Sequence, residues 1–313
     1  MAKSNKRKMN KFIRDAQAGV KDVMISNLSV IAENLINDIM KKATASPESK
    51  KPDAIKGLKA SGLNAYKKEL LHTFTIIAYE AFREAQKEVP KLKTKSTGNI
   101  KFVEDEREVR KLYKKMYKDP DRITPPVHKN FDRRMKKLWE ELPPQTRKKI
   151  TIQRDLFITT QVGDLEKAVF FQFGSSLFNT DSMQTVRADL EDAASDFVTG
   201  PSINAGSATA GSQIVNQARA DFMFSPESES EIEAYQFINN HTTNVTEICT
   251  ELNGQIFLRS DPNAMKFTPP LHYNCRSYVQ PILKGDLRGR KPQRLELSQK
   301  AMDNLKFTES ENQ

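Results

Sequence analysis

The chain has 313 residues, of which 37% are hydrophobic and 29% are charged, and its formal net charge is +10. This length supports one large or two moderate domains with a sizeable core. No stretch approaches roughly 18 consecutive apolar residues, which argues against a membrane span. The basic N-terminus lacks the apolar core of a secretory signal, so we expect both cysteines to be reduced rather than part of a disulfide framework.

The charge is distributed unevenly between the two halves of the sequence. Residues 1–150 hold 36 Lys and Arg against 19 Asp and Glu, and residues 151–313 hold 14 against 21, giving net charges of +17 and −7. This asymmetry predicts that the first half meets a polyanion and the second does not. Double-stranded DNA is the polyanion we expect, because clustered Lys and Arg gain affinity from counterion release without reading sequence. The alternative is an ordinary solvated helical surface.

The first 200 residues show helical signals only. Residues 1–15 form a basic arm, of which we expect residues 3–11 to be disordered on their own, and an extended helical body follows over 16–200. Apolar residues recur at intervals of three and four over 15–42 and again over 63–89, and this period predicts two long amphipathic helices.

Two further helices, over 104–117 and 129–142, are the most basic of the chain. Paired basic residues on them, together with the arm, are our candidate contacts for DNA phosphates. The candidates are Lys6, Arg7, Lys8, Lys114, Lys115, Arg133, Arg134, Lys136 and Lys137.

The middle of the chain is more apolar. Residues 161–178 are apolar enough to form a buried helix, and Asp181-Ser182 is typical of the N-cap of the next one. Gly200-Pro201 should break the chain, and the small-residue stretch 206–212 should lead into a helix through Phe222.

Strand signals appear only near the C-terminus. We therefore predict a mostly α protein with a small α+β module over 206–284, followed by a tail over 285–313. Glu231 to Phe237 and Gln255 to Leu258 are the expected strands.

Both cysteines lie inside this module, each beside tight-turn residues. The first segment reads Thr246-Glu-Ile-Cys-Thr-Glu-Leu-Asn-Gly-Gln-Ile-Phe257, and the second reads Pro269-Pro-Leu-His-Tyr-Asn-Cys-Arg-Ser277. Leu252-Asn-Gly254 indicates a helix end that turns through a left-handed glycine. The two prolines predict that His272 is presented from a stiff, extended segment. We expect the Cys249 and Cys275 segments to lie side by side.

This order of residues resembles the signature of the phage Mu F-like minor head proteins, also called the phage head morphogenesis family. In that family a Thr-bearing turn precedes Cys-x-x-x-Leu-x-Gly-x-x-Phe, and Pro-Pro-x-His-x-x-Cys-Arg follows. An Asn-x-x-Arg helix lies upstream, and Asn216 and Arg219 match it. Many members carry a second Cys three residues after the first, where this chain has Leu252. The matching signature residues are Cys249, Leu252, Gly254, Phe257, Pro269, Pro270, His272, Cys275 and Arg276.

The resemblance implies a minor capsid protein of a tailed phage, present in few copies at the portal vertex inside the virion head and in the host cytoplasm during assembly. The implied partners are the portal protein, the major capsid or scaffold proteins, and double-stranded DNA bound without sequence preference during packaging or ejection. We expect no membrane partner, no enzymatic activity and no cofactor. We expect Arg276 to be buried against a carboxylate or backbone carbonyls.

The Cys and His residues of the module allow a second interpretation. His241, Cys249, His272 and Cys275 are the residue types of a tetrahedral zinc site, and His272-x-x-Cys275 has a usable ligand spacing. Two reduced cysteines packed as small hydrophobic residues, with His272 hydrogen-bonded in a turn, explain the same pattern, and we favour that explanation.

An enzyme is the alternative function for the module. It would be either a metal-dependent hydrolase built on the Cys/His cluster or an ADP-ribosyltransferase, since Glu229-x-Glu231 resembles the catalytic pair of that class. No Ser-Thr-Ser strand precedes the Glu-x-Glu pair, which argues against an ADP-ribosyltransferase. Since we also favour packed, metal-free cysteines, we place both enzymes behind a structural role.

Overall fold

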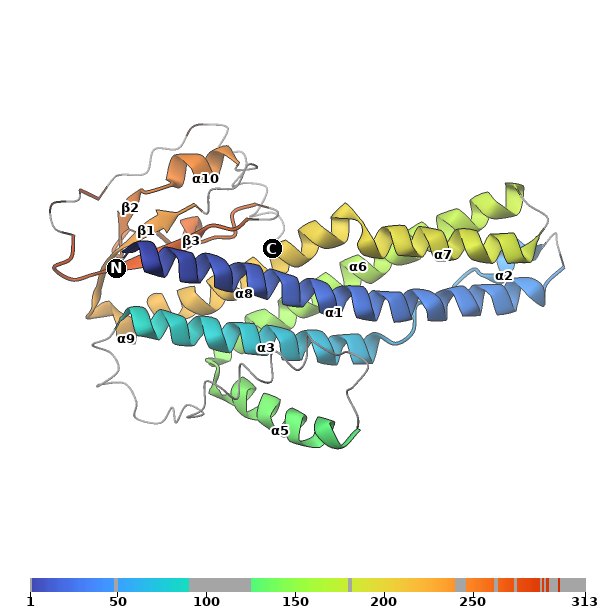
Figure 1. Ribbon diagram of the computed structural model, residues 1–313, viewed down its shortest axis with the longest axis horizontal. Helices are drawn as coiled ribbons and strands as arrows, with labels where there is room; N and C mark the ends of the chain where they lie inside the picture. Colours follow the sequence, from blue (N-terminus) through green and yellow to red (C-terminus); the bar gives the residue numbers. More distant parts are fainter. Residues whose placement is uncertain are drawn as a thin grey trace. The chain divides into compact units, whose positions relative to one another are not determined.

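A computed structural model describes residues 2–47, 50–89, 125–179, 182–239, 246–261, 264–272 and 275–287, together with residues 289, 291, 292 and 298, and in residues 2–6 and 125–132 it describes the backbone only. Helices dominate and a small three-stranded sheet lies near the C-terminus, so the predicted fold class is confirmed (Figure 1). The longer helices are α1 (Ala2–Thr44), α3 (Leu63–Glu88), α5 (Pro125–Glu141), α6 (Pro144–Asn179), α7 (Met183–Thr199) and α8 (Pro201–Met223). The short ones are α2 (Lys51–Ala54), α9 (Pro226–Glu229), α10 (Glu247–Leu252) and the 3₁₀ turn η4 (Ala264–Phe267).

The chain divides into two compact units, each assembled from separate stretches of sequence. Unit 1 contains Met1–Gly19, Phe74–Ile150 and Ala208–Gln313, and unit 2 contains Val20–Thr73 and Thr151–Ser207. Unit 1 therefore combines nearly all of the predicted 206–284 module with parts of the predicted helical body. The boundaries between the units fall within α1, α3, α6 and α8.

The N-terminal residues are part of the first long helix, so the predicted division between a basic arm over 1–15 and a helical body from residue 16 is not a boundary in the structure. α1 begins at Ala2, and Met9, Ile13 and Ala16 are buried. These three residues continue the apolar stripe of the predicted helix toward the N-terminus at intervals of three and four. Their burial holds the first turns in place, while the basic residues between them face solvent.

Unit 2 consists of parts of α1, α3, α6 and α8 together with α2 and α7. Leu28, Leu35, Leu70 and Leu165 are completely buried in it. α7 begins as expected, with the Ser182 side chain accepting a hydrogen bond from the backbone N–H of Thr185, and it ends just before Gly200-Pro201.

The small-residue stretch 206–212 lies inside α8 rather than before it, which corrects the predicted helix start. The small residues stand inside the helix because residues 208–212 of α8 approach the first part of α1 very closely in unit 1. A Cβ atom added to Gly211 would lie 2.8 Å from the Cα atom of Gln17. The Gln17 side-chain N–H donates to the Ala208 carbonyl at 3.0 Å and to the Ser212 hydroxyl at 2.7 Å. Small residues allow this backbone approach, and the amide joins the two helices.

The sheet of unit 1 consists of β2 (Ile256–Leu258), β1 (Ile232–Ile238) and β3 (Tyr278–Leu283), in that order and fully antiparallel. Tyr235 of the central strand lies opposite Phe257 on one side and Pro281 on the other. Tyr235, Phe237 and Phe257 are buried in one hydrophobic cluster with residues of α3, α8 and α10. This cluster is the core against which the signature residues are packed.

Candidate metal centre

Cys249, His272 and Cys275 come from two segments of unit 1. Cys249 lies in the middle of α10, which ends at Leu252. Gly254 then adopts a positive φ of 84° and donates its N–H to the Phe237 carbonyl at 2.8 Å, which confirms the predicted left-handed turn. His272 and Cys275 lie in the irregular segment between η4 and β3, and the Cys275 N–H donates to the His272 carbonyl at 3.2 Å.

The three side chains meet at one point. The Cys249 Sγ atom lies 3.8 Å from the Cys275 Sγ atom and 3.1 Å from the His272 Nε2 atom. All three potential ligand atoms lie within 4.8 Å of one another. Both cysteines are free and buried, whereas His272 is partly exposed. The prediction that the two cysteine segments lie side by side is therefore confirmed.

The two sulfurs have opposite electrostatic environments. A hydrogen bond to Cys275, together with burial, raises the pKa of the Cys249 thiol. Burial also acts to raise the pKa of the Cys275 thiol, but hydrogen bonds from Cys249 and from the His272 ring outweigh it and hold that pKa well below its ordinary value. The two thiols and the imidazole therefore influence one another, as expected for polar groups that share one buried point.

The other signature residues pack around this point. Leu252 and Phe257 are buried in the same hydrophobic cluster as both cysteines, and Pro269 is buried while Pro270 is half-buried. The Ser277 hydroxyl donates to the Cys249 sulfur at 3.2 Å. The signature therefore describes a single packed region.

Arg276 does not take the place predicted for it. Its side chain is half-buried, and within the described residues no hydrogen bond or ion pair involves it. The expectation of a buried Arg276 is not met, because the flanking Cys275 and Ser277 are the residues that face the core, while Arg276 stays half-buried.

The buried arginine of the region is Arg219 on α8. Its guanidinium forms a two-pronged salt bridge with Glu88 of α3, with N···O distances of 3.1 and 2.8 Å, and donates to the Val279 carbonyl of β3 at 3.1 Å. Three residues earlier, the Asn216 side chain donates to the Ser277 carbonyl at 3.1 Å. The Asn-x-x-Arg pair thus fastens α8 to the segment that carries Cys275. The sequence offered the Asn216/Arg219 spacing as a signal, but nothing in it identified Glu88 as the partner.

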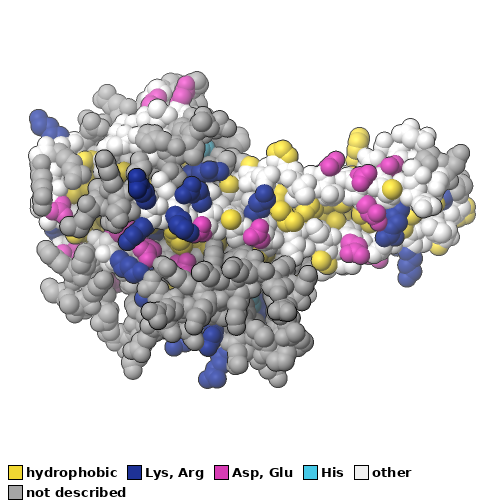
Figure 2. All heavy atoms as spheres, viewed as in Figure 1, with side chains coloured by type: hydrophobic (Ala, Val, Ile, Leu, Met, Phe, Trp, Pro, Cys, Tyr) yellow, Lys and Arg dark blue, Asp and Glu magenta, His cyan; other side chains and the backbone are white. Residues whose placement is uncertain are grey.

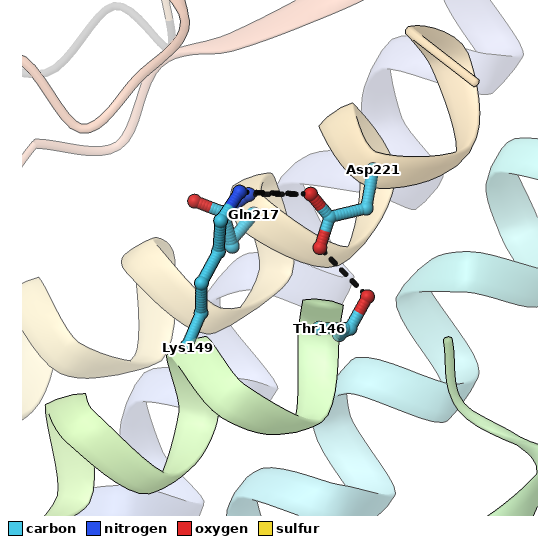
Figure 3. Close-up of polar contacts among 4 residues, drawn as sticks. All are labelled: Thr146, Lys149, Gln217 and Asp221. Atoms are coloured by element: carbon cyan, nitrogen blue, oxygen red, sulfur yellow. Dashed lines mark hydrogen bonds and ion pairs between the residues drawn. The ribbon is translucent and has the colours of Figure 1, made fainter. Parts of the chain in front are cut away.

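A second polar group joins α6 to α8 in unit 1. Asp221 accepts hydrogen bonds from the Thr146 hydroxyl at 2.7 Å, the Lys149 ammonium at 3.0 Å and the Gln217 amide at 2.8 Å (Figure 3). The Asp221 side chain is only 8% exposed, so its charge is compensated by three donors within the fold. We assign this group a structural role.

A third polar group surrounds Arg259, which follows β2. Its guanidinium donates to the Ser225 carbonyl at 2.8 Å, the Ser228 hydroxyl at 3.0 Å and the Tyr235 hydroxyl at 2.8 Å, and it also contacts the Met223 carbonyl. Burial raises the pKa of Tyr235 to about 12, although the Arg259 charge acts to lower it. The group closes the turn between α8 and β1.

The candidate DNA contacts that the structure describes all face solvent. Arg7 and Lys8 are exposed on α1, and Arg133, Arg134, Lys136 and Lys137 are exposed on α5. Figure 2 shows Lys and Arg side chains gathered over the N-terminal part of α1. Lys114, Lys115, His241 and the side chain of Lys6 lie outside the described residues.

No protein-family model, curated protein or solved structure matches this chain. None of the helices among the described residues has the length and apolar character needed to cross a lipid bilayer.

Proposed function

We propose that this chain is a minor structural protein of a tailed-phage particle and that it acts in head assembly at the portal vertex. The observation that carries the proposal is the convergence of the signature residues. Cys249 and Cys275 are 26 positions apart in sequence, yet their sulfurs lie 3.8 Å apart inside one hydrophobic cluster. A sequence signature whose members pack together in this way is typical of a folding module, and the resemblance to phage head morphogenesis proteins gives that module its function.

The exposed basic residues support the second part of the proposal, which is contact with DNA during packaging or ejection. On α5, Met135 and Leu138 are buried while the basic pairs on either side of Met135 point to solvent. Such a helix can present positive charge to phosphates without losing its packing. The binding we propose is weak, independent of sequence and strongly dependent on salt.

A metal-dependent enzyme is the second candidate function, and one observation favours it. Cys249, His272 and Cys275 are a ligand set, and a catalytic metal needs a small number of protein ligands with one open position. We rank it second because both sulfurs are buried in an apolar cluster, which limits access of a substrate to the metal.

The test is capture of the portal protein by the tagged full-length chain from infected cells. One half of the lysate is treated with nuclease, so that a partner bridged by DNA is separated from a direct one. We expect the portal protein to be retained in both halves and identified by mass spectrometry. Retention that is lost with nuclease would leave only the DNA-binding part of the proposal, and absence of the portal protein from both halves would contradict the assembly role.

A further inference from the structure

The meeting of Cys249, His272 and Cys275 has a chemical consequence that packing alone does not explain. His272 and Cys275 lie 23 and 26 residues after Cys249 in the sequence, yet the metal-binding atoms of all three side chains lie within 4.8 Å of one another. Among the described residues they form the one group of three or more His, Cys, Asp or Glu side chains with that geometry. We propose that these three residues bind a Zn²⁺ ion that joins α10 to the segment preceding β3. The inference does not depend on the assembly role proposed above.

The two distances that involve the Cys249 sulfur are close to those of a tetrahedral zinc ion, and the third lies within 4.8 Å. With Zn–S bonds of about 2.3 Å and Zn–N bonds of about 2.0–2.1 Å, a tetrahedral centre places two sulfurs about 3.8 Å apart and a sulfur and a nitrogen about 3.5 Å apart. The Sγ···Sγ distance is 3.8 Å, and the Sγ···Nε2 distance of 3.1 Å requires a movement of only a few tenths of an ångström. The two sulfurs thus lie at the separation expected for two ligands of one ion, whereas the sulfurs of a disulfide lie about 2.05 Å apart.

The donor set selects the metal. Two thiolates and one imidazole suit Zn²⁺, whereas Ca²⁺, Mg²⁺ and Mn²⁺ prefer carboxylate and carbonyl oxygens. Two thiolate charges also cancel the charge of the ion, so the occupied site is neutral. This matters because Cys249 and Cys275 are 1% and 0% exposed, and a net charge at such a depth is costly. The thiol protons displaced by the metal leave to solvent.

The surroundings of the cluster are those of a supported metal site. The Ser277 hydroxyl donates to the Cys249 sulfur at 3.2 Å and can orient that ligand when it is a thiolate. The partial exposure of His272 gives the ion an entry path on one side, from which a solvent molecule would complete the fourth position. The linked segments contain a six-residue helix, a three-residue strand and a 3₁₀ turn. Because these segments contain so little regular structure, a metal ion that crosslinks them would add substantially to the folding stability of the module.

The experiment uses the purified full-length chain, expressed in zinc-supplemented medium and dialysed against metal-free buffer. Elemental analysis should give one zinc per chain. X-ray absorption at the zinc edge should show two sulfur neighbours at about 2.3 Å and two nitrogen or oxygen neighbours at about 2.0–2.1 Å. Because this spectrum is recorded on the unaltered protein, it does not depend on whether a variant folds.

Two variants and a control complete the test. Cys275→Ser and His272→Ala should lose most of the zinc, while His72→Ala, which changes a histidine of unit 2, should keep one zinc per chain. A zinc content near zero in the unaltered chain would overturn the proposal. It would be overturned equally by zinc without sulfur neighbours, or by full zinc retention in both site variants.

Discussion

The salt bridge between Arg219 and Glu88 offers the clearest test of how unit 1 is held together. Arg219 is completely buried, and the Glu88 side chain is 17% exposed. Glu88→Gln keeps the size of the side chain but removes its charge and one of the two acceptor oxygens. The guanidinium is then left buried without a compensating anion, a change that typically costs about 3–5 kcal/mol. The partial exposure of Glu88 places the expected loss at the lower end, about 3 kcal/mol.

A matched control lies one turn earlier on the same helix. Glu84 pairs with Lys87 at 2.7 Å, but both side chains are more than a third exposed. Glu84→Gln should therefore cost no more than about 0.5 kcal/mol, as exposed pairs do. Replacing both members of the buried pair, as Arg219→Met with Glu88→Met, should cost less than the sum of the two single changes, because neither partner is then left unpaired.

Urea denaturation followed by circular dichroism measures all of these variants under one condition. The free energy of unfolding of Glu84→Gln should be close to that of the unaltered protein, and that of Glu88→Gln should be well below it. Equal stability of these two variants would refute the buried salt bridge, and additive losses in the double variant would refute the coupling between its members.

Three further predictions concern other contacts. Gly211→Ala should destabilise the protein by about 1–3 kcal/mol, because its Cβ atom would lie 2.8 Å from the backbone of α1. Gly174→Ala has open space around it and should stabilise the protein by about 0.5–1 kcal/mol. Thermal melts that rank the two variants the other way would contradict the close helix approach. Arg259→Met should cost about 2 kcal/mol, because the Ser228 and Tyr235 hydroxyls and the Ser225 carbonyl lose a charged hydrogen-bond donor. An unchanged urea midpoint would show that the guanidinium does not hold this turn. Reversing Lys136 and Lys137 to Glu should weaken duplex DNA binding at low salt and reduce its salt dependence by about 0.9 per lost phosphate contact. Gel shifts with undiminished affinity would contradict DNA contact through this face of α5.

Local patterns predicted much of the fold. The three- and four-residue spacing of apolar side chains located α1 and α3, Ser182 marked the start of α7, and Gly254 marked the turn before β2. Each of these signals depends on residues close in sequence. The arm prediction failed because the charges of the first residues concealed the continuing stripe of Met9 and Ile13.

Long-range pairing was not predictable in the same way. The sequence could suggest that Cys249, His272 and Cys275 group together, but only the fold shows that the His272 ring lies 3.1 Å from the Cys249 sulfur. Arg276 is one of the signature residues, and Arg219 belongs to the Asn-x-x-Arg helix upstream of them. Only the fold shows that Arg219 is buried, because its partner Glu88 is 131 residues away.

The protein content of purified mature phage particles tests the central claim most directly. Quantitative mass spectrometry of particles banded by density should find this chain in a few copies per particle, at a fixed ratio to the portal protein and far below the major capsid protein. Its absence from particles, while it is abundant in the lysate of the same infected cells, would contradict the account.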